Sequence, residues 1–180
     1  VFLMEPTNLW APWRGEYVKG VSDNKPASAC FLCDAVASPN EDEQRLVVYR
    51  NDHGLILLNR YPYNNGHLLV APLEHVSDLI DLTVKQQTAL MALTVLAEQL
   101  IHATLNPQGV NVGINLGRCA GAGLPGHLHV HLVPRWSGDT NFMGGVGHVR
   151  VIPQANEEVY RDMCRALPGV LEMQQESENE

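Results

Sequence analysis

Apolar residues recur at intervals of three and four from about Thr83 to Leu105, in the segment TVKQQTALMALTVLAEQLIHATL. Glycine and proline are absent from this segment, and Asn106-Pro107 follows its end. A period near 3.6 residues places the apolar side chains on one face of a helix. The pattern therefore predicts one long amphipathic helix.

Short apolar runs elsewhere in the chain predict strands. The first two, RLVVYR (45–50) and LILLN (55–59), flank the turn NDHG, and this arrangement favours a hairpin. Three further strands are expected, namely HLLVAP (67–72), the glycine-laced GVNVGINLG (109–117) and HLHVHLVP (127–134).

Two shorter helices complete the expected fold. One lies in PASACFLCDAVAS (26–38), and a terminal helix covers NEEVYRDMCRAL (156–167), with Asn156 at its N-cap. The main elements then follow the order β-β-β-α-β-β-α. This order predicts an α+β fold: an antiparallel five-stranded sheet with one long helix and a C-terminal helix.

The chain length and the charge pattern predict a single domain with two appendages. Residues 1–27 read as an N-terminal arm, 28–167 as the domain, and 168–180 as an acidic disordered tail.

The composition excludes several classes of partner. With a net charge of −8 and no basic stripe, we expect no binding of long nucleic acid, although a small phosphorylated ligand fits. We find no apolar run of the roughly 20 residues that cross a bilayer, so no membrane association is expected. The four cysteines show no disulfide framework and no secretory signal is visible, which favours the cytoplasm.

Three histidines alternate with aliphatic residues in GHLHVHLVPRW (126–136). In a strand, His127, His129 and His131 share one face, while the aliphatic residues between them share the other. Three interpretations remain open: a solvent-facing strand, a metal site built on His-x-His, and a nucleophilic imidazole with helpers.

The segment before the histidines bears on the third interpretation. A neutral imidazole attacks phosphorus through one nitrogen when a fixed acceptor holds the proton on the other. The loop GAG (121–123) lets backbone N–H groups approach a phosphate closely. Loop and imidazoles together are typical of a phosphoryl or nucleotidyl transfer site.

These segments resemble the histidine triad (HIT) superfamily. HLHVHLV is similar to its signature, LNRYPYNNGHLLVAPLEH (58–75) and GVNVGINLG resemble the segments around it, and the resemblance covers about residues 28–136. LWAPWR (9–14), CFLC (30–33) and GDTNFM (138–143) most resemble the bacterial branch related to diadenosine tetraphosphate phosphorylases.

The resemblance implies a role for each matching residue. His129 would be the nucleophile, His131 would contact the scissile phosphate, and His67 would orient the cluster. The implied nucleotide-binding residues would hold the ribose (Asn59), the phosphate (Asn115, Gly123) and the base (Leu57, Leu69).

The implied activity is nucleotidyl transfer from a dinucleoside polyphosphate (diadenosine tetraphosphate-like) through a covalent nucleotidyl-histidine, with inorganic phosphate as the expected acceptor. Rival functions are a hydrolase of dinucleoside polyphosphates or nucleoside phosphoramidates, and a non-catalytic nucleotide-binding protein. Small adenine nucleotides are the expected partners, a homodimer the expected assembly, and no catalytic cofactor is expected. One departure is that Gly123 and Leu124 stand where many members carry Gln-Ser.

The pair CFLC is by itself only half of a zinc site; a redox pair or two buried cysteines are alternatives. The resemblance implies that Cys30 and Cys33 join His75 and His127 in a structural zinc site. His127 would then be a ligand.

Overall fold

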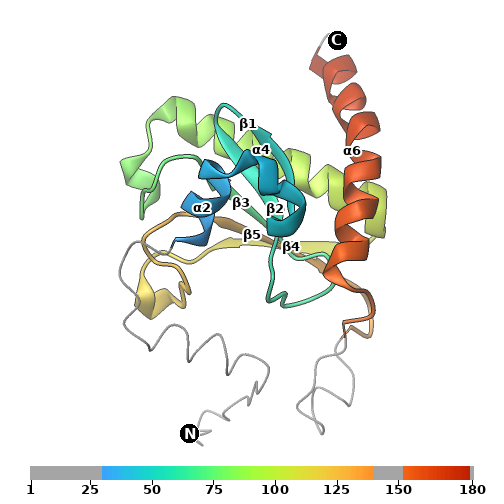
Figure 1. The fold of residues 1–180 in the computed structure, drawn as a ribbon. Coiled ribbons are helices and arrows are strands. Elements are labelled where there is room, and N and C mark those ends of the chain that lie inside the picture. Colours follow the sequence, from blue (N-terminus) through green and yellow to red (C-terminus); the bar gives the residue numbers. More distant parts are fainter. Residues whose placement is uncertain (1–29, 140–151, 179–180) are drawn as a thin grey trace, which may run out of the picture.

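The computed structural model of the chain describes residues 30–139 and 152–178. Five antiparallel strands form one sheet in the order β1-β2-β3-β5-β4 (Figure 1). The strands are β1 (Val47–Asn51), β2 (Gly54–Leu58), β3 (Leu68–Pro72), β4 (Gly109–Ile114) and β5 (Val130–Arg135). The expected α+β class and five-stranded antiparallel sheet are confirmed.

Helices precede, interrupt and follow the strands. They are α2 (Phe31–Ala37), α3 (Asp42–Arg45), α4 (Val84–Leu105) and α6 (Asn156–Glu178), with the short 3₁₀ turns η2 (Pro39–Glu41), η3 (Leu79–Asp81) and η4 (Arg118–Ala120). From β1 to α6 the main elements follow the expected order β-β-β-α-β-β-α. The expected N-terminal arm, residues 1–27, lies outside the described residues.

The hairpin expected between β1 and β2 is confirmed, and side-chain chemistry explains it. The Asn51 side chain accepts hydrogen bonds from the backbone N–H groups of His53 (2.9 Å) and Gly54 (3.1 Å), which turns the chain. A Cβ at Gly54 would collide with the Ala71 carbonyl oxygen on β3, so glycine permits the close approach of the strands there.

The sheet is covered on both faces, which is why every residue of β2 is buried. On one face, Ile56, Leu58 and Leu132 pack in the cluster that includes α4 and α6. On the other face, Leu57 and Leu69 pack in a smaller cluster with residues of α2. The second face also carries the histidines.

The long helix α4 begins in a capping box. The Thr83 hydroxyl accepts from Gln86 N–H (3.3 Å), and the Gln86 side chain accepts from Thr83 N–H (2.8 Å). Within the described part of the chain, α4 alone is long and apolar enough, by length and composition, to cross a membrane. This differs from the expectation that no apolar run is long enough to do so. The apolar residues of α4 that are buried pack in the core against the sheet, namely Leu90, Leu93, Leu96, Ala97, Leu100 and Ile101.

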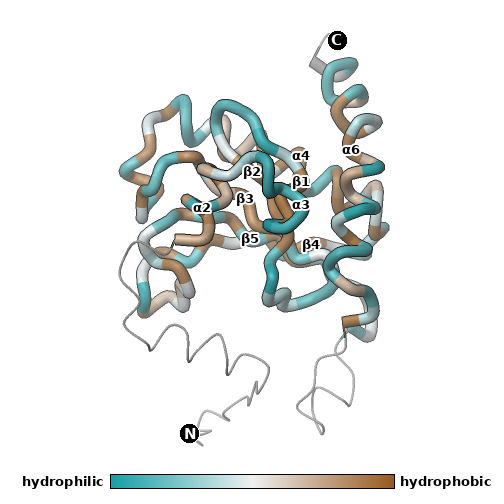
Figure 2. Tube along the Cα trace, viewed as in Figure 1, coloured by the Kyte–Doolittle hydropathy of each residue, from teal (hydrophilic) through white to brown (hydrophobic). Residues whose placement is uncertain are grey.

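The terminal helix α6 is longer than its sequence pattern predicts. It continues past Pro168 to Glu178, through the segment expected to be a disordered tail. Hydrophobic and hydrophilic bands alternate along it in Figure 2, and Val170 is buried in the core beyond the proline. Asn156 does not precede the helix as a cap. It is the first helical residue, and its side chain donates to Asn59 O (3.3 Å).

Candidate active site

The predicted site residues come from adjacent strands of the sheet. His67 immediately precedes β3, His131 lies in β5, and Asn115 follows β4. In the strand register, His131 stands opposite Leu69 of β3 and Gly113 of β4. The order β3-β5-β4 therefore places an imidazole from each of two segments and an amide from a third on one face.

The histidine strand begins later than expected. Regular pairing starts at Val130, so His127 and His129 precede β5. The reason is that Leu128 N–H donates to Val76 O (2.7 Å), outside the ladder. Of the three histidines expected in the strand, only His131 belongs to it. The rings of His129 and His131 nevertheless pack edge to face, with centroids 4.8 Å apart.

His129 carries its proton on the nitrogen that faces the backbone. Its Nδ1 lies 2.7 Å from His127 O, and since a carbonyl oxygen only accepts, Nδ1 must be the donor. Burial lowers the pKa of His129, a shift that this hydrogen bond opposes, and the neutral form is favoured. Nε2 is then left with a lone pair, as a nucleophile requires.

In the pair His67–His131 the protons lie on the opposite ring nitrogens from that of His129. The backbone N–H of Tyr63, which can only donate, lies 3.1 Å from Nδ1 of His67. The proton of neutral His67 is therefore on Nε2, which donates to Nδ1 of His131 (3.0 Å). The proton of His131 is in turn on its Nε2. The side-chain amide of Asn115 lies 3.5 Å from this nitrogen and accepts its proton when the amide is turned so that the oxygen faces His131.

Burial keeps His131 neutral. Desolvation, followed by the nearby His129, lowers its pKa from 6.5 to about 4. A neutral imidazole donates a hydrogen bond through N–H but is a very weak acid. His131 is therefore suited to binding an anionic oxygen and not to releasing a proton to a leaving group.

The other predicted nucleotide-binding residues surround the histidines in different ways. The side-chain oxygen of Asn59 accepts from Tyr61 N–H (2.9 Å), and its nitrogen lies 3.3 Å from Nδ1 of His67. Leu57 and Leu69 face each other across β2 and β3 and are buried in the α2 cluster. Gly123 is exposed in the loop after η4, where Gly121 adopts a left-handed φ of 91° that glycine accommodates readily.

A cavity of about 590 Å³ lies apart from the histidines, and none of the predicted site residues lines it. Its walls come from α3, the segment after β2 and the start of α6: Glu43, Gln44, Leu46, Arg60, Pro62, Ile152, Gln154, Asn156 and Glu157.

The four predicted metal ligands converge. The ligand atoms of Cys30, Cys33, His75 and His127 all lie within 4.8 Å of one another. Nδ1 of His75 is 3.1 Å from Sγ of Cys33, and Nδ1 of His127 is 3.3 Å from Sγ of Cys30. In a tetrahedral Cys₂His₂ zinc site, sulfur and nitrogen ligands stand about 3.5 Å apart, so these residues fit the ion.

The surroundings of the cluster agree with a metal site. Nε2 of His127 donates to Pro72 O (3.0 Å), which leaves the Nδ1 lone pair directed at the sulfurs. Burial and the adjacent Cys30 raise the pKa of Cys33 to about 11, so without a cation this thiol keeps its proton. Metal binding would displace that proton.

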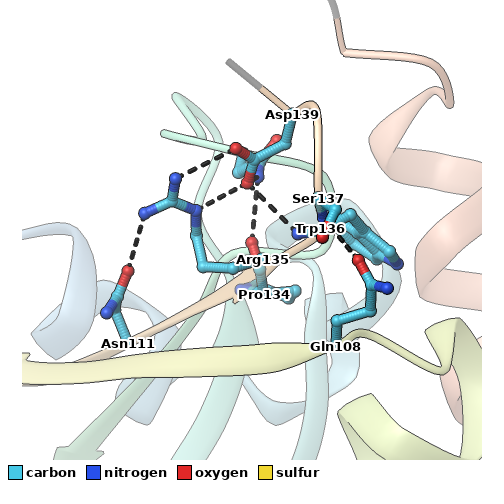
Figure 3. A network of polar contacts seen from close by, with 8 residues as sticks. Gln108, Asn111, Pro134, Arg135, Trp136, Ser137 and Asp139 are labelled. Atoms are coloured by element: carbon cyan, nitrogen blue, oxygen red, sulfur yellow. Dashed lines mark hydrogen bonds and ion pairs between the residues drawn. The ribbon is translucent and has the colours of Figure 1, made fainter.

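Two residues that contribute to the site, Tyr63 and Asp139, are not among those expected from the sequence. Tyr63 supplies the N–H that sets the proton positions in His67 and His131. Asp139 is held by Arg135 at the end of β5 (Figure 3) and accepts a hydrogen bond from Asn64, in the segment between β2 and β3. Tyr63 lies between motif residues in RYPYNNGH, so its nearness to His67 was visible. Its backbone role was not, because a backbone donor carries no residue signature.

Comparison with known proteins gives consistent matches. Residues 40–138 match the model of the HIT domain family. The chain is 44% identical to the AP-4-A phosphorylase of Mycobacterium tuberculosis over 162 residues, which are 88% of this chain and 81% of that protein. It is 36% identical to the asymmetrical bis(5'-nucleosyl)-tetraphosphatase of Schizosaccharomyces pombe over 93 residues, 52% of this chain and 50% of that protein.

Among solved structures, a zinc-bound histidine triad family protein from Mycobacterium smegmatis is similar in fold. The TM-score is 0.64 and the sequence identity 25%, over 82% of this chain and 99% of that chain.

Proposed function

The chain belongs to the HIT domain family, and from this premise we propose that it is an enzyme that cleaves dinucleoside polyphosphates by nucleotidyl transfer to His129. The observation that carries the proposal is the hydrogen bond from Nδ1 of His129 to His127 O, which leaves Nε2 unprotonated. The names of the phosphorylase and tetraphosphatase relatives support this substrate class.

The reaction has two displacements at one phosphorus atom. The Nε2 lone pair of His129 forms a bond to the α-phosphorus, and the P–O bond to the nucleoside polyphosphate breaks, with its electron pair going to the leaving oxygen. An acceptor oxygen then attacks the same phosphorus, and the electron pair of the P–N bond returns to His129. Inorganic phosphate as acceptor yields a nucleoside diphosphate, whereas water yields the monophosphate.

The other residues bind and orient. The Nε2–H of His131 would donate to an oxygen of the reacting phosphate, and His67 would hold His131 in that orientation. Asn115 and the Gly123 loop would add donors to the phosphate. Asn59 would hold the ribose, and Leu57 and Leu69 would contact the base.

We favour phosphate over water as the acceptor. The support is the AP-4-A phosphorylase relative, which matches 88% of this chain, whereas the tetraphosphatase matches 52%. A hydrolase acting on dinucleoside polyphosphates or phosphoramidates uses the same first step and is the second candidate.

Turnover of diadenosine tetraphosphate with and without inorganic phosphate tests the proposal. A phosphorylase forms ADP and ATP only with phosphate present. AMP and ATP without phosphate would identify a hydrolase. Absence of turnover with either acceptor, and with an adenosine phosphoramidate, would contradict catalysis and leave nucleotide binding alone.

The variant His129→Ala tests the covalent step. We expect it to lower kcat by about three orders of magnitude or more while nucleotide binding persists, because only the nucleophile is lost. Mass spectrometry of denatured wild-type protein during turnover should detect the nucleotidyl adduct, and the variant should lack it. His102→Ala, at an exposed position on α4, is the matched control.

We further propose that Cys30, Cys33, His75 and His127 hold a structural zinc ion. The convergence of their ligand atoms supports this, and so does the zinc-bound solved relative. Zinc would supply fold stability and leave the chemistry to His129, with no catalytic cofactor.

A homodimer formed at β4 is the assembly that we propose. Among the described residues this strand is at the edge of the sheet, and Val112 on it is 53% exposed. Unpaired strand edges with apolar side chains are suited to association with a second copy. A cytoplasmic location without long nucleic acid partners also remains a proposal, supported by the free cysteines and the acidic charge.

A further inference from the structure

The segment between β2 and β3 folds over the pair His67–His131. Its Tyr63 ring is nearly parallel to His131, at 20° with centroids 5.8 Å apart, and is tilted against His67 with centroids 4.7 Å apart. One aromatic side chain therefore contacts both imidazoles of the pair. Neither the expected catalytic set nor the nucleotide-binding set includes it.

The residue after Tyr63 ties this segment to the strand that carries His131. The buried Asn64 side chain donates to Pro134 O (2.9 Å) and to Oδ2 of Asp139 (3.0 Å). Asp139 is itself held at the end of β5 by the side chain of Arg135 (2.6 Å) (Figure 3). The residue that follows Tyr63 is thus hydrogen-bonded to the strand that carries His131.

The backbone of Tyr63 acts on the same pair. Its N–H donates to Nδ1 of His67, and this donation determines which nitrogens of His67 and His131 carry protons. Because the ring and the backbone N–H belong to the same residue, a shift of the Tyr63 ring would also move the donor that sets the tautomers.

We propose that Tyr63 is a positioning residue for the nucleotidyl transfer: it fixes the orientation and tautomer of the His67–His131 pair so that Nε2–H of His131 points at the reacting phosphate. The proposal rests on the proposed function of the site. Tyr63 acts through the imidazoles and takes no part in bond making.

A positioning residue is needed because a neutral imidazole has two tautomers and can rotate by about 180° about its Cβ–Cγ bond. If His131 presented a lone pair in place of N–H, it would repel the phosphate oxygen that it is meant to bind. Substrate binding depends mostly on other groups, whereas the transition state needs this donor in place. Loss of the Tyr63 ring should therefore affect kcat more than KM.

Three variants of the full-length protein test the proposal. We expect Tyr63→Ala to lower kcat on diadenosine tetraphosphate by about tenfold or more, with KM changed less than threefold. Tyr63→Phe should retain wild-type kcat, because phenylalanine keeps the ring that contacts the pair. Tyr61→Ala, which removes an exposed tyrosine two residues away, is the matched control and should leave kcat unchanged.

Long-range ¹H–¹⁵N spectra of the histidine side chains supply a readout that does not depend on turnover. In wild type and Tyr63→Phe, Nε2 of His131 should give the shift of a protonated nitrogen and Nδ1 that of an unprotonated one. In Tyr63→Ala the two shifts should move toward each other, as for exchanging tautomers. If Tyr63→Ala does not fold, Tyr63→Leu replaces it, because leucine fills part of the space without a stacking ring.

The outcomes separate the two proposals. A folded Tyr63→Ala or Tyr63→Leu with wild-type kcat and wild-type nitrogen shifts would overturn the positioning role, whatever the activity of the protein. No turnover in wild type, together with altered shifts in the variant, would overturn the proposed function while Tyr63 still sets the tautomers. A rise in KM with unchanged kcat would assign Tyr63 to substrate binding and would also contradict the proposal.

Discussion

His129 and His131 are identical side chains two positions apart, yet they present opposite groups for chemistry. Nδ1 of His129 donates to a backbone carbonyl, so its Nε2 keeps a lone pair. Nδ1 of His131 accepts from His67, so its Nε2 bears the proton. The partner of the inner nitrogen decides the role of the outer one.

The lowered pKa of His131, about 4, has a consequence for stability. In the unfolded chain His131 takes up a proton near pH 6.5, whereas in the folded protein it does so only near its lowered pKa of about 4. The stability contributed by neutral His131 is therefore fully present above pH 6.5 and is lost as the pH falls through about 4.

We therefore expect the free energy of unfolding to drop between roughly pH 7 and pH 5, and His131→Gln to make this drop smaller. Urea unfolding at both pH values measures it. His102→Gln, at an exposed position, is the control and should leave the drop unchanged. An NMR titration of His131 with a midpoint near 6.5 would contradict the expectation.

At the scale of elements, the start of α4 is determined by local chemistry. The capping box of Thr83 and Gln86 satisfies N–H groups that the first helical turn leaves without partners. We expect Thr83→Ala to destabilise the protein by about 1 kcal/mol, measured by urea unfolding.

A second threonine on the same helix is the control for this change. Thr88 lies on the exposed side of α4, and its hydroxyl donates to Val84 O within the same helix (2.9 Å). Thr88→Ala should change the free energy of unfolding by less than about 0.5 kcal/mol. Equal effects of the two substitutions would show that the cap contributes nothing specific.

Two elements depart from their sequence patterns because of tertiary contacts. The alternation of histidine and aliphatic residues predicts a strand that begins at residue 127. In the structure Leu128 N–H donates to Val76 O, and regular strand pairing starts at Val130. Pro168 favours an end of the terminal helix, but Val170 is buried in the core and the helix continues. Tertiary contacts outweigh local propensity at both places: a backbone hydrogen bond at Leu128 and core packing at Val170.

At the scale of the molecule, the proposed zinc ion would connect three distant segments: the start of α2, the chain after β3 and the chain before β5. Removal by a chelator should lower Tm by about 5 °C or more, because the ion restrains these segments in the folded state only.

Metal analysis and scanning calorimetry of reduced protein check the zinc prediction. Cys33→Ser should lose the metal, whereas Cys119→Ser, at an exposed cysteine in η4, should keep it. Less than stoichiometric zinc in reduced wild type, with a Tm insensitive to chelator, would refute the prediction.

The proposed dimer gives the second prediction at this scale. We expect Val112→Asp to produce a monomer in light scattering, because it places like charges at the β4 edge of both copies. Met173→Asp, at an exposed apolar position on α6, should not alter the mass. A wild-type monomer would exclude the assembly.

Periodicity and residue type, which are local properties, determined the fold class, the hairpin and the long helix, whereas the proposed roles of the histidines came from the family resemblance. Only the tertiary structure decided which nitrogens carry protons and how far α6 extends. It also brought Cys30 to His127, across 97 residues, and His67 to His131, across 64. The resemblance to a known family had implied these clusters; the spacing of the residues had not. The reason is that proton positions depend on donors and acceptors from other segments. A stretch of GHLHVHLV alone does not contain the N–H of Tyr63 or the carbonyl of Pro72 that orient its imidazoles.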